Sequence, residues 1–564
     1  MLFSQKSWSV KNACYNKSMK RFKFKSVVQL ANIRLSVKSA AIVLASSTMV
    51  SALLGLFRDR LLNSYYLGTY PAGIDAYTAA FTIPDFMFFI LTSGALAVSF
   101  IPVFNQRLIA GNKKSAWELS SSLLNLLAIL TLITSVLIMI FADPLIRYVV
   151  SPGLDESGMI LAINMTRVIA INPFLFSLAT VLMSIQQAVG RFVFYSLAPT
   201  IYNIGIIIGI TCFTGGINLF GVQIFEGGIM GVALGVILGA IMQLIVALIG
   251  LFGLGFDYEF KINWKNQGFR TILKLLPPRS LDQGMDYVNS LVSTNLSSRM
   301  GAGAVRSFDQ ATSLHTMPVN LIGVAISTAF FPKLTEELGN GDKNEFYDTF
   351  RKALRMIAWI ALPISIIAFF GRGYVVSFIS NIGNNGSNGT MASILGTLCV
   401  AIFAKSIFHI ASRGFYAYQD TRTPFRVSIV AVGLTVALSV AAWLLNWGVD
   451  GLGIAQSIGA FVEIVILLAI LQKRSDGKLL NKGFWQAFLK MMFATIITGA
   501  VAFSMTKFVP LMATDTSLVI TIPKFAFIVS VSGIAYLVAS YFLGLDEIEP
   551  IVNYIKKVLF KNAK

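Results

Sequence analysis

Long apolar segments recur along the whole of this 564-residue chain, and they restrict its fold more than any other feature. About 14 segments of about 20 residues lie between short charged or Pro/Gly-rich spacers, and about 20 residues is the length an α-helix needs to cross a bilayer. Hydrophobic residues make up 55% of the chain and charged residues only 13%, about half the charged share of a soluble domain. We predict an all-α, polytopic membrane protein.

Basic residues indicate how the chain is oriented in the membrane. Residues 1–38 contain nine Lys or Arg residues and no acidic residue. If the N-terminus is cytoplasmic, the two tails and the even-numbered loops hold about 34 of the 45 Lys and Arg residues, in agreement with the positive-inside rule. We therefore predict that both termini are cytoplasmic. The basic tail also suits anionic lipid headgroups, and because no folded nucleic-acid reader accompanies it, nucleic acid is not an expected partner.

Motifs for common catalytic and metal sites are missing from the sequence. The three cysteines (Cys14, Cys212 and Cys399) are too scattered for a disulfide framework or a metal site, and there are only two histidines. The sequence has neither a G-x-x-x-x-G-K-[ST] loop nor a G-x-S-x-G turn. We therefore expect no metal, no cofactor and no enzymatic activity.

An internal repeat indicates how the segments are grouped. Residues 83–102 and 317–332 both begin near a proline, contain small residues and end in F-x-P, and the turns at Ala188 and Ala417 also match. Each matched pair lies about 230 residues apart, a separation that indicates a duplicated unit. Because six segments separate the copies, both copies cross the membrane in the same direction, as parallel repeats. We predict a basic tail at 1–36, an N-lobe of six helices at 37–256, a C-lobe of six helices at 257–483, and two further helices with a cytoplasmic tail at 484–564.

Charged residues within the first two apolar segments are candidate functional residues, because charge inside a membrane is costly and usually marks function. Arg58 and Asp59 lie near the end of the first segment. Two interpretations remain open: the pair anchors the helix end, or the guanidinium binds an anion at a cavity mouth. Asp85 follows Pro84 in the second segment, where it either pairs with a neighbouring arginine or takes part in proton or cation coupling.

The seventh segment contains a polar stripe. Its members recur every three or four residues and therefore share one face of a helix: Arg279, Asp282, Asp286, Asn289, Ser293 and Ser297. A continuous stripe of this length favours cavity lining over a buried structural network.

Three further features lie in the second half of the chain. Lys405 and Glu463 are expected to pair across the C-lobe, either structurally or as coupling residues. Arg299 and Arg306 flank a Gly-Ala loop, where they are either solvated loop charges or additional anion-binding groups.

Several motifs resemble one known family. They are GLFRD (55–59), DAYTAAFTIPDF (75–86), GALAVSFIPVF (94–104), APTIYNI (198–204) and GFYAYQDTRTP (414–424). On these motifs the chain resembles the MurJ/MviN family of lipid II flippases, in the multidrug/oligosaccharidyl-lipid/polysaccharide exporter superfamily. The resemblance extends from about residue 36 to about residue 545, and GFYAYQDTRTP is its most specific part.

The resemblance implies a two-lobed transporter of 14 helices that flips undecaprenyl-diphosphate-linked disaccharide-pentapeptide across the bacterial inner membrane for peptidoglycan synthesis. Guanidinium groups bind phosphate oxygens bidentately, which suits a diphosphate cargo. Arg58 and Asp59 match the family's Arg-Asp pair. The family's other cavity arginines are replaced here, by Ala52, Phe88, Phe89 and, in the eighth helix, about Ser313, and Asp85 stands where the family usually has Asn.

The leading prediction is therefore a flippase for lipid II. The predicted substrate-binding residues are Arg58, Asp59, Arg279, Asp282, Asp286 and Asn289, and the coupling candidates are Asp85, Lys405 and Glu463. Three alternatives remain open: a flippase for another undecaprenyl-linked glycan, an ion-coupled drug exporter, and a non-transporting scaffold for peptidoglycan synthesis enzymes. The expected partners are the lipid-linked cargo and membrane lipids, with those enzymes added in the scaffold case.

Overall fold

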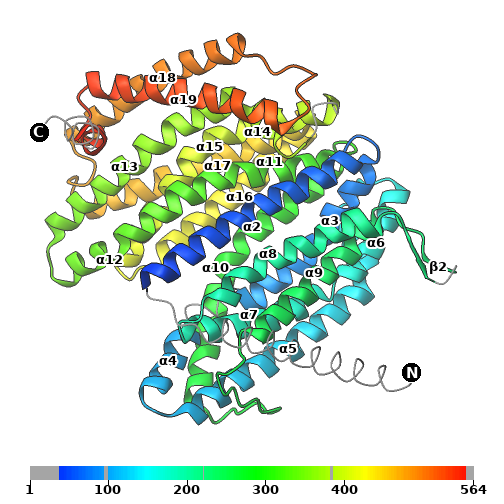
Figure 1. Ribbon diagram of the computed structural model, residues 1–564. Helices are drawn as coiled ribbons and strands as arrows, with labels where there is room; N and C mark the ends of the chain where they lie inside the picture. The colour runs from blue at the N-terminus through cyan, green and yellow to red at the C-terminus, as the bar shows by residue number, and fades with distance from the viewer. Residues whose placement is uncertain (1–36, 94–99, 220–221, 381–384, 554–564) are drawn as a thin grey trace, which may run out of the picture. The chain divides into compact units, whose positions relative to one another are not determined.

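The computed structural model describes residues 37–93, 100–219, 222–380 and 385–553, almost all of them in helices (Figure 1). The predicted basic tail at 1–36 lies outside these residues. The elements of the first half of the chain are α2 (Val37–Tyr66), α3 (Pro71–Phe88), η1 (Phe89–Ser93), α4 (Ile101–Ile109), α5 (Lys113–Pro144), η3 (Leu145–Val150), α6 (Glu156–Ile169), α7 (Asn172–Ala188), α8 (Val193–Ile208), η4 (Gly209–Phe213), β1 (Ile217–Leu219), β2 (Val222–Phe225) and α9 (Met230–Ile249).

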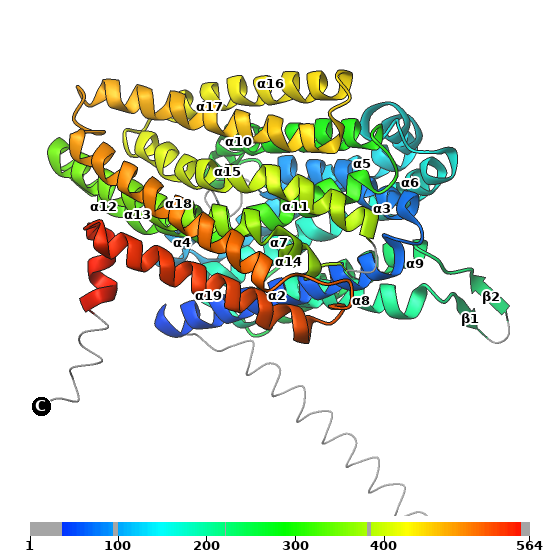
Figure 2. The same cartoon turned by 90° about the horizontal axis from the view of Figure 1, so that it is seen from above.

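In the described part of the second half, all the regular elements are helices. Its elements are α10 (Gln267–Ser298), α11 (Ala304–Val319), η5 (Asn320–Val324), α12 (Ala325–Gly339), α13 (Lys343–Phe370), α14 (Arg372–Ser377), α15 (Asn385–Ala417), α16 (Arg422–Leu444), α17 (Gly448–Arg474), α18 (Lys482–Phe508), α19 (Leu518–Phe542) and η6 (Asp546–Ile548). The pair α16 and α17 and the pair α18 and α19 pack side by side (Figure 2).

The prediction of an all-α polytopic membrane protein is confirmed. Within the described residues, 13 helices or helix pairs are long and apolar enough to cross a membrane. α10 is a further long helix, of 32 residues, but the side chains of its residues 274–286 are outside the description. β1 and β2 form a short antiparallel hairpin between α8 and α9, which the sequence analysis did not predict.

The internal repeat is visible in local backbone geometry. Pro84 in α3 precedes a π-helical turn at Phe89–Ser93, and Pro318 in α11 precedes another at Asn320–Val324. A proline removes one hydrogen bond from a helix, and π-turns are one way the backbone adjusts. Related π-helical turns therefore occur at matched places in the two halves.

Two matched turns repeat the same hydrogen bond. Arg191 N–H donates to the Gln186 carbonyl at 2.9 Å, and Asp420 N–H donates to the Phe415 carbonyl at 3.0 Å. The residue before each donor has a positive φ, 77° at Gly190 and 58° at Gln419. Glycine adopts this left-handed backbone freely and glutamine rarely does, so the second turn keeps the geometry of the first without its glycine.

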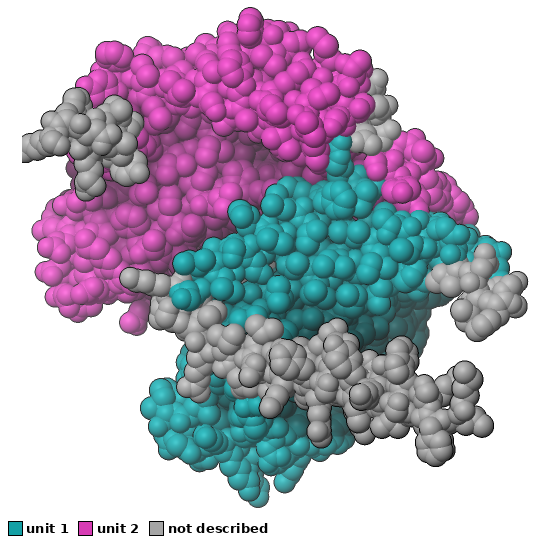
Figure 3. Space-filling view, in the orientation of Figure 1, with its two compact units in different colours: residues 1–61, 80–148, 159–287 teal, residues 62–79, 149–158, 288–564 magenta. Residues whose placement is uncertain are grey.

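The chain forms two compact units (Figure 3). Unit 1 lies within residues 1–61, 80–148 and 159–287, and unit 2 within residues 62–79, 149–158 and 288–564. Each has its own apolar core. In unit 1 the core includes Phe100, Phe104 and Phe269, and in unit 2 it includes Phe350 and Phe415.

Glycines bring α8 and α9 close together in unit 1. A Cβ atom added at Gly205 would lie 2.2 Å from the Gly239 Cα, and one added at Gly209 would lie 2.5 Å from the Gly235 Cα. Small residues at helix interfaces allow this approach in membranes, where apolar burial gives little driving force between helices. Backbone-to-backbone contact therefore holds this helix pair.

Candidate functional site

Arg58 and Asp59 lie inside α2, not at its end as expected, because the helix continues to Tyr66. The Arg58 guanidinium donates to Asp59 Oδ1 at 3.0 Å and to Asn203 Oδ1 on α8 at 3.0 Å. Asn203 also donates to Ser51, about two turns before Arg58. The side chains of Arg58 and Asp59 are 24% and 14% exposed. The small polar face of α2 therefore packs on α8 and keeps the guanidinium fixed and partly accessible.

The polar stripe of α10 is described only in its second half. The side chains of Arg279, Asp282 and Asp286 lie outside the described residues. Asn289 is half-buried. Further along, Ser293 and Ser297 are buried, and Ser293 accepts a hydrogen bond from Gln456 on α17 at 3.4 Å.

Ser293 and Ser297 therefore do not line an open cavity in this structure. Ser293 contacts another helix of its own unit, and Ser297 donates to the Thr294 carbonyl of its own helix. Serine is small enough to lie at a close helix interface and still find a partner.

Aromatic packing occupies the two positions, at the end of α3 and the start of η1, where the resemblance places arginines. The ring of Phe88 packs edge-on against Phe176 at 5.6 Å, and the ring of Phe89 lies 4.5 Å from that of Tyr287. Asp85 lies one turn earlier and is half-buried. This part of unit 1 therefore has an aromatic cluster next to a carboxylate.

The expected pair of Lys405 and Glu463 is present in unit 2. Lys405 Nζ lies 3.9 Å from Glu463 Oε2, and Ser428 on α16 donates to Glu463 Oε1 at 2.7 Å. Glu463 is almost fully buried, whereas the Lys405 side chain is 35% exposed. The Glu463 carboxylate on α17 therefore contacts side chains from both α15 and α16.

A buried cluster at the start of α11 was not predicted from the sequence. The Asp75 carboxylate accepts from the backbone N–H of Gly303 at 2.6 Å and of Arg306 at 2.7 Å. These are orphan donors at a helix N-terminus, which favours negative charge. The Arg306 guanidinium donates to Asn63 Oδ1 at 2.9 Å, and Asn63 donates to the Ile379 carbonyl at 2.7 Å.

Arg306 is therefore not a solvated loop charge: it lies in α11 with 4% of its surface exposed. Asp75 and Gly303 are 228 residues apart in the sequence, so their contact could not be predicted from a local pattern. The Gly-Ala motif, which contains Gly303 with its φ of 83°, was the one feature of this cluster that the sequence analysis singled out as a loop.

Two other arginines of unit 2 stack on aromatic rings. Arg299 lies 5.2 Å from the ring of Trp443 and is exposed, in agreement with one of its two interpretations. Arg413, which the sequence analysis did not single out, donates to the Thr328 hydroxyl at 2.7 Å and lies 5.7 Å from the Phe331 ring. Arg413 is a charged residue inside an apolar helix, directly before the GFYAYQDTRTP motif. This position is the sequence feature that could have identified it as a candidate functional residue.

Metal ligands do not gather in the part of the chain that the structure describes: no group of three His, Cys, Asp or Glu side chains there is placed to hold an ion. The cationic groups described above are arginines and Lys405, with their carboxylate or amide partners. Such groups suit the recognition of anions by hydrogen bonding.

Comparison with known sequences decides the family. The sequence profile described as "Lipid II flippase MurJ" matches residues 63–522, most of the chain. The chain belongs to the MurJ family. A protein of Bdellovibrio bacteriovorus named as a probable lipid II flippase MurJ is 25% identical over 460 residues, covering 79% of this chain and 84% of that protein. A protein of Buchnera aphidicola subsp. Schizaphis graminum with the same name is 25% identical over 531 residues, covering 93% and 100%.

Solved structures agree with MurJ family membership at the level of the fold. A lipid II flippase MurJ in an inward closed conformation is similar with a TM-score of 0.68 at 21% identity, covering 89% of this chain and 98% of that chain. An inward-facing multidrug resistance MATE family transporter of the MOP superfamily follows with a TM-score of 0.63 at 19% identity, covering 78% and 99%.

Proposed function

We propose that this protein flips lipid II from the inner to the outer leaflet of the bacterial cytoplasmic membrane for peptidoglycan synthesis. The observation that carries the proposal is the family match over residues 63–522, which includes the APTIYNI asparagine, Asn203, that holds Arg58. Both termini would be cytoplasmic, as the distribution of basic residues favours. Peptidoglycan synthesis enzymes are proposed as further partners.

Transport would proceed by alternating access between an N-lobe at 37–256 and a C-lobe at 257–483, with residues 484–564 outside the repeat. The polyprenyl chain stays in lipid while the diphosphate and sugars cross through a polar passage. An inside-negative membrane potential favours outward movement of the diphosphate by about 2.3 kcal/mol per charge per 100 mV.

The proposed contacts to the cargo are Arg58, Asp59, Arg279, Asp282, Asp286 and Asn289. Arg58 is the residue whose geometry supports this most directly, because Asp59 and Asn203 fix its guanidinium while leaving 24% of the side chain exposed. A fixed guanidinium loses little freedom when it binds a phosphate. Asp85, Lys405 and Glu463 are proposed to couple lobe movement to an ion or to the membrane potential.

Native mass spectrometry of the purified protein with equal amounts of lipid II and an undecaprenyl-diphosphate monosaccharide tests the cargo. We expect preferential retention of lipid II, and a loss of about tenfold in Arg58→Ala, since a charge-assisted hydrogen bond contributes about 1.5–3 kcal/mol. Arg167→Ala is the matched control, because Arg167 is an exposed arginine of α6 in the same unit.

Two results would contradict the proposal. Equal retention of both lipids, unchanged in Arg58→Ala, would favour another undecaprenyl-linked glycan, an alternative supported by the aromatic cluster at Phe88 and Phe89. Retention of neither lipid would favour the scaffold.

A further inference from the structure

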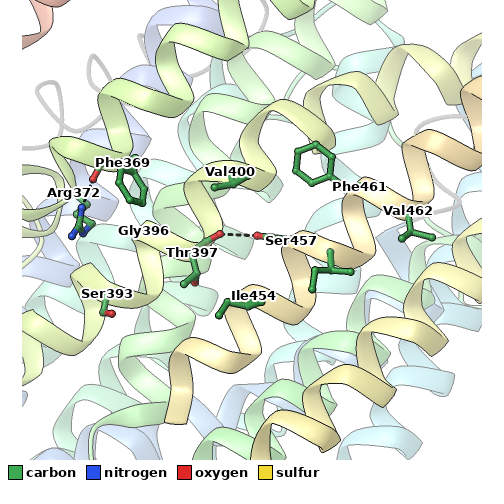
Figure 4. A pocket seen from close by; sticks show the side chains of 11 residues that line it. Phe369, Arg372, Ser393, Gly396, Thr397, Val400, Ile454, Ser457, Phe461 and Val462 are labelled. Atoms are coloured by element: carbon green, nitrogen blue, oxygen red, sulfur yellow. Dashed lines mark hydrogen bonds between the residues drawn. The ribbon is translucent and has the colours of Figure 1, made fainter. Parts of the chain in front are cut away.

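Unit 2 contains a groove of about 610 Å³ that none of the charged residues above enters. Its walls come from the end of α13, the start of α14, and facing sides of α15 and α17 (Figure 4). The volume is in the range of small-molecule pockets. Arg372 and Ser393 lie toward one end of the groove and Phe461 and Val462 toward the other, with Thr397 and Ser457 between them (Figure 4).

Arg372 lies at one end of the groove, at the first residue of α14. Its Nη1 donates to the Phe369 carbonyl at 2.7 Å, and its guanidinium lies 4.9 Å from the Phe369 ring. Gly396 of α15 gives it room, since a Cβ there would lie 3.0 Å from the Arg372 Cδ. No carboxylate of the described residues lies within ion-pair distance of this guanidinium. Arg372 is thus positioned by the fold but not neutralised by it.

The hydroxyl groups of the lining are already used as donors. Ser393 donates to Asp450 Oδ2 at 2.6 Å, Thr397 to the Ile394 carbonyl at 2.7 Å, and Ser457 to the Thr397 carbonyl at 2.7 Å. The remaining N–H groups of Arg372 are therefore the donors that this groove offers to a ligand, and they suit one anionic group.

The other end of the groove is apolar and uncovered. Val400, Ile454 and Ile458 are 49%, 38% and 42% exposed. Phe461 also lines this end of the groove. From Ser393 to Val400 the helix rises about 10 Å, within the roughly 15 Å depth of one leaflet of a 30 Å hydrocarbon core. In the proposed orientation α13 ends on the outer side, so the groove extends from the outer interface toward the bilayer centre.

We propose that this groove binds one anionic phospholipid of the outer leaflet, with its phosphate at Arg372 and an acyl chain along Val400, Ile458 and Phe461. The Arg372 guanidinium, which has no carboxylate within ion-pair distance in the described residues, complements one phosphate. Because the groove stays within the depth of one leaflet, it suits an acyl chain of a lipid in that leaflet. The ligand is distinct from the proposed cargo, which carries a diphosphate and a longer polyprenyl chain. The inference uses the proposed orientation and does not depend on the cargo.

Native mass spectrometry of the full-length protein with equal amounts of phosphatidylglycerol and phosphatidylethanolamine, matched in acyl chains, tests this site. We expect the wild type to retain phosphatidylglycerol preferentially. Arg372→Gln should lower its retention about fivefold, to that of phosphatidylethanolamine, since one basic residue near an anionic surface contributes about 1 kcal/mol. Lys507→Gln is the matched control, because Lys507 is exposed on the same proposed side and also stacks on a phenylalanine, Phe503.

A second variant tests the apolar end. Val400→Trp fills the groove from an exposed position while leaving Arg372 in place, and it should lower retention of both phospholipids. An unchanged preference in Arg372→Gln would overturn the proposal, and so would an equal loss in Lys507→Gln, which would indicate surface charge alone. A lipid II arm separates the two ligands: loss of lipid II but not of phosphatidylglycerol in Arg372→Gln would assign the groove to the cargo and also overturn the proposal.

Discussion

The two halves of the chain hold a charged pair from the same place in the repeat, but they do so with different chemistry. Asn203 lies four residues after Pro199 in α8 and binds Arg58. Ser428 lies four residues after Pro424 in α16 and binds Glu463, the partner of Lys405. One half therefore anchors a cation and the other an anion. The matched position therefore contacts a guanidinium on α2 in the first half and a carboxylate on α17 in the second.

The interface between α8 and α9 in the first half and the interface between α16 and α17 in the second half also differ in the contact that a glycine makes. In the first half Gly205 on α8 meets the Gly239 backbone on α9. In the second half Gly459 on α17 meets the side chain of Thr435 on α16, whose Oγ1 would lie 1.9 Å from an added Cβ. A side chain has more freedom to move away than a backbone does, so the two halves should differ in their tolerance of change.

Alanine at these two glycines should give the largest difference between the halves. Gly205→Ala forces two backbones apart and should destabilise by about 3 kcal/mol, the upper range for overpacking. Gly459→Ala displaces one threonine side chain and should cost about 1 kcal/mol. Thermal unfolding in detergent can be followed with a thiol-reactive dye in a Cys14→Ser/Cys212→Ser background, because Cys212 is exposed whereas Cys399 is buried. Equal losses would contradict the comparison.

Removal of each carboxylate should give the next largest difference. Glu463→Ala leaves Lys405 without its ion-pair partner in the membrane interior and should cost about 2 kcal/mol, less than a fully buried pair because Lys405 is partly exposed. Asp59→Ala should cost about 1 kcal/mol or less, because Arg58 keeps its bond to Asn203. The measurement is the same unfolding assay.

The control for this prediction is the double variant Lys405→Ala/Glu463→Ala. Because it removes both charges, it should be more stable than Glu463→Ala alone. If the double variant were the less stable of the two, Lys405 would not depend on Glu463.

Periodic features of the sequence were predictable, and contacts across long separations were not. The helices and the Lys405–Glu463 pair follow from hydropathy and from the rarity of charge inside membranes. The bonds from Asp75 to Gly303 and Arg306 join residues more than 220 positions apart, and no local pattern encodes such a contact. The burial of Ser293 and Ser297 was missed for a related reason, since a polar stripe has the same spacing whether it faces water or a neighbouring helix.

The matched turns allow one further comparison, at a single position of the repeat. The first turn has Arg191, which donates to the carbonyls of Phe252 and Gly253. The second has Asp420, which lies between two membrane-spanning segments and accepts from Thr423 and Arg474, at the ends of two such segments. Only the second turn therefore depends on a group that titrates in acid.

Acid should destabilise the second turn alone, and this is the smallest expected effect. Partial desolvation raises the pKa of Asp420, but hydrogen bonds from Thr423 and Arg474 outweigh it and lower the pKa to about 2. Since this is below the unfolded value of about 3.9, the carboxylate stabilises the fold above about pH 4, and that stabilisation is lost as the pH falls toward 2.

Partial exposure limits the contribution of Asp420 to about 1 kcal/mol or less. Unfolding of wild type and Asp420→Asn should therefore differ at pH 7 and converge between pH 4 and pH 2. The matched variant Arg191→Gln removes a guanidinium bound to carbonyls, which do not titrate, so its difference from wild type should stay constant over that range. A constant difference for Asp420→Asn would show that this carboxylate contributes through its shape and not through its charge.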